Sequence, residues 1–178
     1  MPRLAAFLRG INLGNRRLTM DELAATFVDF GVENVATYQA AGNVVFDAHA
    51  PDPAALEARI ETHLASALGY PVDTFLRPLA GLASLPVLDG VEAARAEGFK
   101  PHVIFLKQPV DDDAAAALGA LETPDDRFRA LGREVLWLRR GRLSDGPIST
   151  DDVKRALGRR TTTMRTLGTV LRLVAKFG

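Results

Sequence analysis

Three arginines, two glycines and two asparagines lie close together in the segment Leu8 to Leu23, whose sequence is LRGINLGNRRLTMDEL. Glycine and asparagine permit a loop with positive φ angles, in which backbone N–H groups turn inward toward an anion. The loop leads into a helix pattern, and the N-terminus of a helix attracts negative charge. Arginine adds two parallel hydrogen bonds to a phosphate or carboxylate. We therefore predict an anion-binding site formed by Arg9, Gly10, Asn12, Gly14, Asn15 and Arg17.

The same segment has a second interpretation, which requires no ligand. It lacks the terminal Gly-Lys-Ser/Thr of a P-loop and the three-glycine spacing of a dinucleotide-binding turn. In a plain turn, glycine supplies the positive φ, asparagine bonds to the backbone, and Arg9 pairs with a carboxylate. The sequence leaves both interpretations open.

A second group of arginines and hydroxyl side chains lies in RRTTTMRT, from Arg159 to Thr166. We predict that Arg160, Thr163 and Arg165 form a further ligand-binding group at the start of the last helix. Threonines at this place are also favourable helix caps, which is the alternative without a ligand. If the fold brings this segment and Asn43 beside the Arg9 loop, all of them form one basic pocket.

Residues with catalytic or metal-binding potential are few. The histidines His49, His63 and His102 are far apart, and none has a carboxylate or a second histidine at metal-ligand spacing. No serine stands in a nucleophile elbow, and Asp111 to Asp113 open a helix, where acids favour the helix dipole. Cysteine is absent. We therefore expect no metal and no cofactor, and since no general base can be nominated, whether the chain is an enzyme stays open.

The charged residues are divided unevenly along the chain. From Arg127 to Lys176 there are 13 Lys and Arg against four Asp and Glu, whereas the rest of the chain has 9 against 18. Such an asymmetry indicates either an anion-facing surface or electrostatic attraction between two halves of one molecule or of neighbouring subunits.

Local patterns predict that the first half of the chain folds in the order βαββαβ. Thr19 followed by Glu22 is a capping box, and Asp52 followed by Pro53 is a second helix start. That order is typical of a ferredoxin-like unit, a four-stranded antiparallel sheet with two helices on one face. The predicted strands are 4–8, 35–39, 43–47 and 71–77, and the predicted helices are 20–30 and 53–68.

The second half repeats this pattern with one difference, an extra helix where a fourth strand would stand. The predicted strands are 103–106, 127–130 and 134–139, and the predicted helices are 112–121, 150–157 and 163–177. We therefore predict an α+β protein of two tandem ferredoxin-like (βαββαβ) subdomains with antiparallel sheets. Their predicted ranges are 1–78 and 100–178, the second with an extra C-terminal helix, and 79–99 is a connecting segment.

Four segments carry a resemblance to a known family: FLRGINLG, MDEL, TYQAAGNVVF and TMRTLGTVLRL. In these the chain resembles the bacterial family catalogued as domain of unknown function 1697. The resemblance implies tandem ferredoxin-like subdomains and no established activity. It also implies that Arg9, Gly10, Asn12 and Gly14 occupy motif positions of the family, without saying what they bind.

Composition indicates an ordinary globular chain. Hydrophobic residues make up 47% and charged residues 25% of the sequence, and no apolar run approaches the roughly 20 residues that span a membrane. With no secretory signal, we expect a cytoplasmic protein without a membrane partner. Our first hypothesis is a binding module for a phosphate-bearing small molecule or nucleic acid. The alternatives are an enzyme acting on an anionic small molecule and a protein-interaction or homo-oligomerising unit.

Overall fold

The computed structural model describes residues 1–178 except residues 13, 15, 40–41 and 88–89. The chain divides into two compact units. The first unit consists of Met1–Ala83 with Leu173–Gly178, and the second unit consists of Ser84–Arg172. Each unit contains a four-stranded antiparallel sheet, which confirms the α+β class.

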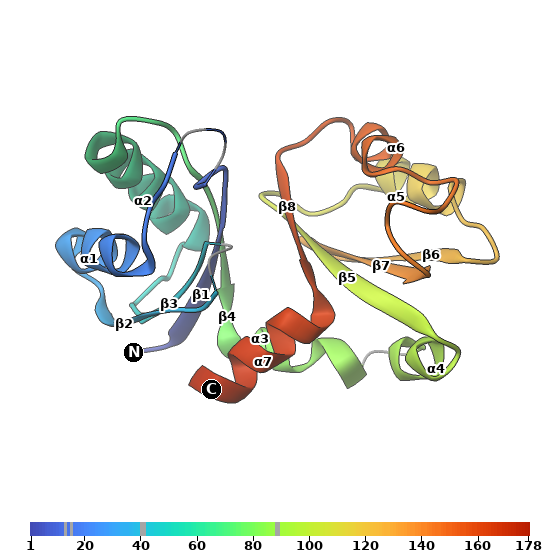
Figure 1. The fold of residues 1–178 in the computed structure, drawn as a ribbon, viewed down its shortest axis with the longest axis horizontal. Coiled ribbons are helices and arrows are strands. Elements are labelled where there is room, and N and C mark those ends of the chain that lie inside the picture. The colour runs from blue at the N-terminus through green and yellow to red at the C-terminus, as the bar shows by residue number, and fades with distance from the viewer. Residues whose placement is uncertain (13, 15, 40–41, 88–89) are drawn as a thin grey trace. The chain divides into compact units, whose positions relative to one another are not determined.

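In the first unit, two helices cover one face of the sheet (Figure 1). The strand order across the sheet is β2-β3-β1-β4. Leu8, Phe27, Phe46 and Leu64 belong to the core between helices and sheet. The elements are β1 (Arg3–Arg9), α1 (Met20–Phe30), β2 (Glu33–Thr37), β3 (Asn43–Asp47), α2 (Pro53–Leu68) and β4 (Asp73–Pro78).

The helix starts of the first unit follow the predicted capping residues. Thr19 donates its N–H to Glu22 Oε2 over 2.8 Å, and Glu22 donates its own N–H to Thr19 Oγ1 over 3.2 Å. The Asp52 carboxylate accepts from the first N–H groups of α2, which begins at Pro53. These reciprocal bonds satisfy donors that would otherwise have no intrahelical partner. Both predicted caps are confirmed.

The edge strand β4 is protected by acids of α2. Thr74 donates its N–H to Glu61 Oε1 over 2.7 Å, and Leu76 donates its N–H to Glu57 Oε1 over 2.8 Å. Pro78, the next residue on the same side of the strand, has no N–H. The outward N–H groups of Thr74 and Leu76 are therefore already bonded, and Pro78 offers none. Another strand has no free donor at these positions with which to pair.

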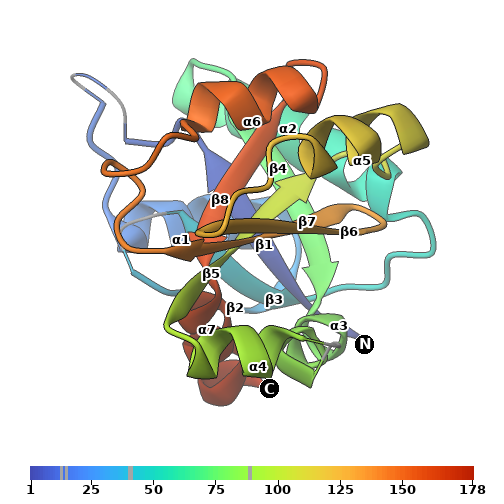
Figure 2. The ribbon, with the colours of Figure 1, turned by 90° about the vertical axis from the view of Figure 1, so that its right-hand side faces the viewer.

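The second unit has the same order of strands and helices, and α5 and α6 lie on one side of its sheet (Figure 2). The strand order across the sheet is β6-β7-β5-β8. Ile104, Leu118, Trp137 and Val153 belong to its core. The elements are β5 (Phe99–Leu106), α5 (Asp112–Gly119), β6 (Asp126–Leu131), β7 (Glu134–Arg140), α6 (Thr150–Ala156) and β8 (Thr162–Thr166).

The predicted helix 163–177 is wrong over its first residues. Thr162–Thr166 form the strand β8, which pairs with β5, and the helix α7 begins only at Leu167 and ends at Phe177. Threonine is β-branched and favours extended backbone, and β5 supplies backbone partners for it. The fourth strand missing from the predicted pattern is therefore present.

The predicted connecting segment 79–99 contains short helices. These are α3 (Leu79–Ala83), the 3₁₀ helix η1 (Leu85–Val87) and α4 (Val91–Ala96). Residues 88–89 between them lie outside the described part of the chain. None of the helices in the described residues is both long and apolar enough to cross a membrane.

Candidate functional site

The side chain of Arg9 stands at the end of β1, beside the loop of residues 10–19. Arg9 pairs in register with Asp73 of β4, and its Nη1 lies 3.6 Å from Asp73 Oδ2. The two side chains are 46% and 45% exposed, so water screens their attraction. The ion pair of the ligand-free interpretation thus exists, but it is long and exposed.

The loop after Arg9 is held by its own polar groups. Asn12 Oδ1 accepts the N–H of Leu18 over 2.9 Å, which closes the loop from one end to the other. Gly10 and Gly14 have φ angles of 80° and 60°, a conformation that favours glycine. Asn12 therefore shapes the loop instead of presenting its amide as a separate ligand contact. Asn15, also predicted for the site, lies outside the described residues.

Tyr70, which follows α2, fixes the loop from outside. Its hydroxyl donates to the carbonyl of Ile11 over 3.1 Å. The guanidinium carbon of Arg16 lies 4.0 Å from the centre of the Tyr70 ring, a cation–π contact. Sequence reasoning missed Tyr70 because nothing in the local pattern connects it with a loop more than fifty residues earlier.

Arg16 and Arg17 are the exposed cations of this loop. Arg17 Nη1 donates to the backbone carbonyls of Gly14 over 3.3 Å and of Arg16 over 3.2 Å. In the described part of the chain neither Arg16 nor Arg17 pairs with a carboxylate. Together with Arg9 they give one short loop three guanidinium groups.

The β2–β3 hairpin adjoins the loop through Gly42. Leu8 donates its N–H to Gly42 O over 2.8 Å, and a Cβ at Gly42 would lie 3.1 Å from Leu8 Cβ. Asn43 is fully buried, and its Nδ2 donates to the Tyr38 carbonyl over 2.9 Å. Asn43 thus follows the residue that contacts the end of β1, and its amide holds the hairpin together.

The N-terminus of α1 contributes less positive charge than its position predicts. The N–H groups of Leu18, Thr19 and Glu22 already have acceptors, and the Glu22 carboxylate lies at the helix start. Hydrogen bonds from the Thr19 N–H and hydroxyl lower the pKa of Glu22, so this carboxylate is ionised at neutral pH. The guanidinium groups are therefore the main attraction for an anion here.

The second predicted group lies in the second unit and is divided. Arg165 Nη1 donates to Thr163 Oγ1 and to the Met164 carbonyl, both over 2.9 Å. Burial lowers the pKa of Arg165 to about 10. Arg160 instead binds the Asp111 carboxylate and the Pro109 carbonyl. The structure therefore brings Thr163 and Arg165 together, but not Arg160.

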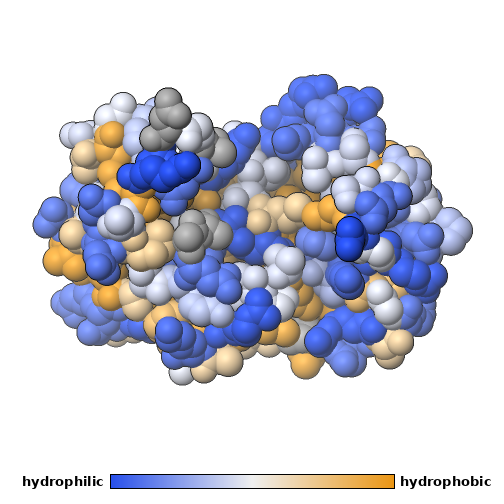
Figure 3. All heavy atoms as spheres, viewed as in Figure 1, coloured by the Kyte–Doolittle hydropathy of each residue, from blue (hydrophilic) through white to orange (hydrophobic). Residues whose placement is uncertain are grey.

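The two units differ little in net charge, although the charges are divided unevenly along the sequence. The second unit has 15 Lys and Arg against 13 Asp and Glu, and the first has 7 against 9. Hydrophilic residues cover most of the face in Figure 3, with hydrophobic residues in separate small areas. Many arginines of the second unit pair with acids of that unit: Arg127 with Glu97, Arg129 with Glu122, Arg140 with Asp125, Arg155 with Asp151 and Asp152, and Arg160 with Asp111.

A buried ion pair of the second unit was not predicted. Arg139 Nη1 lies 3.2 Å from Asp126 Oδ1, and the two side chains are 1% and 0% exposed. Asp126 Oδ1 also accepts from Trp137 Nε1 over 2.8 Å, and Arg139 donates to the carbonyl of Ile148 over 2.7 Å. The cluster joins strands β6 and β7 to the loop before α6, so it is structural.

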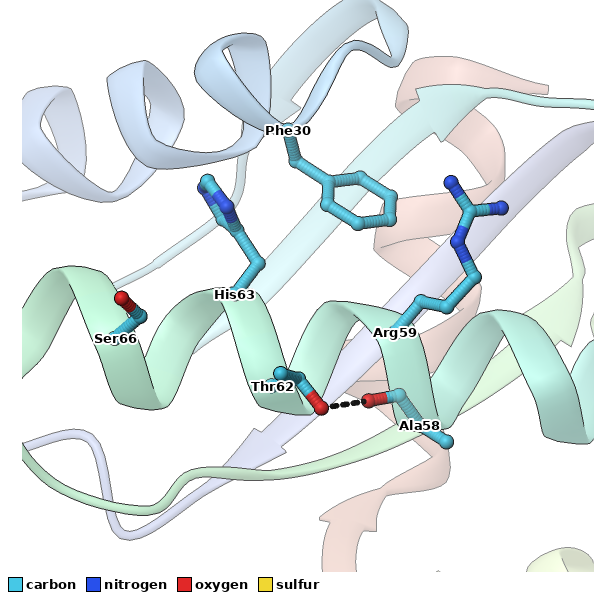
Figure 4. A pocket seen from close by; sticks show the side chains of 6 residues that line it. All are labelled: Phe30, Ala58, Arg59, Thr62, His63 and Ser66. Carbon is cyan, nitrogen blue, oxygen red and sulfur yellow. Dashed lines mark hydrogen bonds between the residues drawn. The ribbon is translucent and has the colours of Figure 1, made fainter.

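A hollow between α1 and α2 has a volume of about 460 Å³ (Figure 4). Arg59 and His63 of α2 point toward Phe30 at the end of α1. His63 Nε2 lies 3.0 Å from the Thr26 carbonyl, so this nitrogen is engaged by the backbone. The hollow offers no nucleophile paired with a base. Among the described residues, no group of three or more His, Cys, Asp or Glu has metal-binding geometry.

The fold defines an α+β protein of two units, each with a four-stranded antiparallel sheet. The chain belongs to the family described as "Protein of unknown function (DUF1697)", whose model matches residues 1–136. The resemblance stated from the sequence is thereby confirmed, and the matched range includes the Arg9 loop.

Comparison with solved structures finds a similar fold. The conserved bacterial protein SP0830 from Streptococcus pneumoniae matches with a TM-score of 0.71 and 22% sequence identity, over 98% of this chain and 97% of that chain. At this identity the similarity concerns the fold. No curated protein matches.

Proposed function

We propose that the chain is a binding module for a phosphate-bearing small molecule, held by Arg9, Arg16 and Arg17. The observation that carries the proposal is the pair Arg16 and Arg17, on a loop fixed by Asn12 and Tyr70. Both guanidinium groups are exposed, and neither has a carboxylate partner among the residues that the structure describes. Arginine matches the geometry of phosphate oxygens through paired donors. Displacing Asp73 from its exposed 3.6 Å pair with Arg9 costs little, so Arg9 is available to a ligand.

A small ligand fits this loop better than a nucleic acid. A nucleic-acid surface needs many phosphate contacts along an extended basic face. The first unit has fewer basic than acidic residues, 7 against 9, and its basic side chains outside the loop include the buried Arg77. Nucleic-acid binding therefore remains the second candidate, and an enzyme or a homo-oligomer has no observation in its favour beyond the sequence.

We also propose that each unit is ferredoxin-like. The strand orders β2-β3-β1-β4 and β6-β7-β5-β8, each with two helices on one face, support this description. In such a unit the loop after the first strand lies at one end of the sheet, beyond the ends of its strands, where it is open to a ligand. The cytoplasmic location predicted from the sequence stays a prediction.

The test is calorimetric titration with inorganic phosphate, ADP and a short RNA. The triple variant Arg9→Ala, Arg16→Ala, Arg17→Ala should bind the phosphate compound about 10- to 100-fold more weakly, since charge-assisted hydrogen bonds are lost. Arg59→Ala, an arginine of α2 in the same unit, is the matched control and should bind as the wild type does. Equal affinity of the triple variant and the wild type would overturn the proposal. Tighter binding of RNA with a steep salt dependence would favour the second candidate.

A further inference from the structure

A second cavity, with a volume of about 670 Å³, lies within the first unit. It is bounded by the start of β1, the end of β4, the helix α3 and the last residues of α7. None of its lining residues belongs to the Arg9 loop, so it has no part in the function proposed above. The side chains that matter for its chemistry are Arg3, Pro78, Leu79, Ala83, Val174 and Phe177.

The walls of this cavity are mostly hydrocarbon. Among its described lining residues, Arg3 is the one with a charged side chain, and the others are apolar residues or glycine. Leu79 of α3 is buried, which anchors that wall in the core of the unit. The ring of Phe177 packs edge-on against Tyr38, with ring centres 6.2 Å apart, which anchors the α7 wall. An apolar molecule therefore finds firm apolar contacts here.

Arg3 is the polar side chain of the cavity, and most of its donors are engaged. Its Nη1 donates to Asp47 Oδ1 over 3.0 Å and to the Asn34 carbonyl over 3.2 Å. Its Nε donates to the Phe177 carbonyl over 3.2 Å. Its Nη2 has no acceptor among the residues that the structure describes. Arg3 therefore holds a guanidinium group in a fixed position with one nitrogen left to donate to a ligand.

The positive charge of Arg3 is already compensated. Asp47 is its register partner on β3, and the Asp47 carboxylate lies 3.0 Å from the guanidinium group. Hydrogen bonds from Asn34 and Arg3 lower the pKa of Asp47, so this carboxylate is ionised at neutral pH. Lys176, whose Nζ lies 5.3 Å from the centre of the Phe177 ring, is exposed and does not line the cavity, so water screens its charge. An ionised ligand would lose its hydration here without meeting an uncompensated counter-charge.

We propose that this cavity binds an uncharged small molecule with an apolar body and a carbonyl oxygen, which is the chemistry of a ketone, an ester or an amide. The carbonyl oxygen accepts a hydrogen bond from Nη2 of Arg3, and the apolar body packs on Leu79, Val174 and Phe177. Cavities of this size, mostly apolar and with a few fixed polar groups, are typical of small-molecule sites. A carbonyl uses the remaining donor of Arg3 and adds no charge to the compensated pair.

Three probes separate the parts of this proposal in ¹H–¹⁵N NMR titrations of the full chain. Benzylacetone carries both the apolar body and the carbonyl, hydrocinnamate has a similar shape with a negative charge, and acetone has the carbonyl without the apolar body. Benzylacetone should shift the amides of Ala83, Val174 and Ala175 with a Kd of about 1 mM or tighter. Hydrocinnamate should bind several-fold more weakly, and acetone at the same concentrations should give no saturable shifts.

Two variants test the cavity itself. Ala80→Leu combined with Ala175→Leu adds bulk from the α3 and α7 walls and should raise the Kd for benzylacetone about tenfold or more. Ala25→Leu combined with Ala67→Leu, the same substitutions on the exposed faces of α1 and α2, should leave the Kd unchanged. Arg3→Lys keeps the charge but loses the planar set of donors, so it should raise the Kd about three- to tenfold.

The proposal is overturned if benzylacetone gives no saturable shifts at about 10 mM, if hydrocinnamate binds as tightly, or if the filled variant binds as the wild type does. Arg3→Lys with wild-type affinity would also overturn it. If Arg3→Lys does not fold, the filled variant and the comparison with hydrocinnamate decide the question. The triple variant of the Arg9 loop should bind benzylacetone as the wild type does, so the failure of either proposal is seen separately.

Discussion

The loops after the first strand of each unit occupy equivalent positions but differ in what they expose. In the first unit, residues 10–19 follow β1 and carry Arg16 and Arg17, which have no carboxylate partner in the described residues. In the second unit, residues 107–111 follow β5, and Asp111 both caps α5 and binds Arg160. The same arrangement of strands and helices thus holds an open basic loop in one unit and a neutralised one in the other. The function we propose therefore depends on the loop after β1 and not on the fold that supports it.

The elements after the last strand of each sheet differ most in size, so their removal should have the largest effect. β4 is followed by the 5-residue α3, whereas β8 is followed by the 11-residue α7, in which Leu167, Val170 and Leu173 are buried. A chain ending at Thr166 should lose about 5 kcal/mol or more of stability, an amount comparable to the whole stability of many domains.

Thermal unfolding followed by circular dichroism is the measurement for this truncation. Val170→Asp should reproduce the loss because it places a charge at a fully buried position, whereas Arg172→Asp, on the exposed side, should not. A truncated chain that remains monomeric and melts cooperatively near the wild-type temperature would contradict the account.

The buried pair Asp126–Arg139 should be the next most sensitive feature. Asp126→Ala leaves Arg139 buried without its counter-charge and Trp137 Nε1 without its acceptor, so we expect a loss of about 3 to 5 kcal/mol. Asp125→Ala removes the neighbouring carboxylate, whose 3.1 Å pair with Arg140 is exposed, and should cost less than about 1 kcal/mol. Urea unfolding monitored by tryptophan fluorescence compares the two variants, and equal losses would show that burial of the pair is unimportant.

Tyr70→Phe tests how far the basic loop depends on its support. The change removes the hydrogen bond to the Ile11 carbonyl and keeps the ring under Arg16, so we expect a loss of about 1 kcal/mol. A less rigid loop should also bind phosphate compounds a few-fold more weakly. Tyr38→Phe is the control, since its ring contacts Phe177 edge-on and its hydroxyl is not part of the loop. Unchanged phosphate affinity in Tyr70→Phe would remove Tyr70 from the site.

The smallest effect should appear in the acid dependence of stability. Hydrogen bonds lower the pKa of Glu22 at the start of α1, and a bond from the Ala114 N–H lowers that of Asp111 at the start of α5. A carboxylate with a lowered folded-state pKa adds stability above its unfolded-state pKa, and this stability is lost as the pH falls through the folded-state value. Glu22→Gln and Asp111→Asn should therefore each flatten the decline in urea midpoint between about pH 5 and pH 3. A decline as steep as in the wild type would show that these bonds do not contribute.

Features set by neighbours in the sequence were predictable, whereas features set by distant partners were not. The caps Thr19–Glu22 and Asp52–Pro53 depend on residues within one turn, and both form as predicted. The strand Thr162–Thr166 depends on its pairing with β5, so its sequence alone resembled a helix cap. Likewise, the uneven charge along the chain is cancelled by pairs such as Arg160–Asp111, whose members are far apart in sequence.

The candidate site was predictable in its residue types but not in their roles. Gly10 and Gly14 adopt the positive φ angles that their loop requires, as a local pattern can indicate. The roles of Asn12 and Asn43 as hydrogen-bonding supports could not be read from the sequence, since each depends on which carbonyl or N–H group lies opposite. Tyr70 entered the site only through the fold.

The most direct test of the contrast between the two loops is a ¹H–¹⁵N NMR titration of the full chain with ADP. Saturable shifts should be confined to the amides of residues 9–19 and to Tyr70, with little change at residues 107–111, where Asp111 already binds Arg160. Shifts of equal size at residues 107–111, or none at residues 9–19 at saturating ADP, would contradict the account.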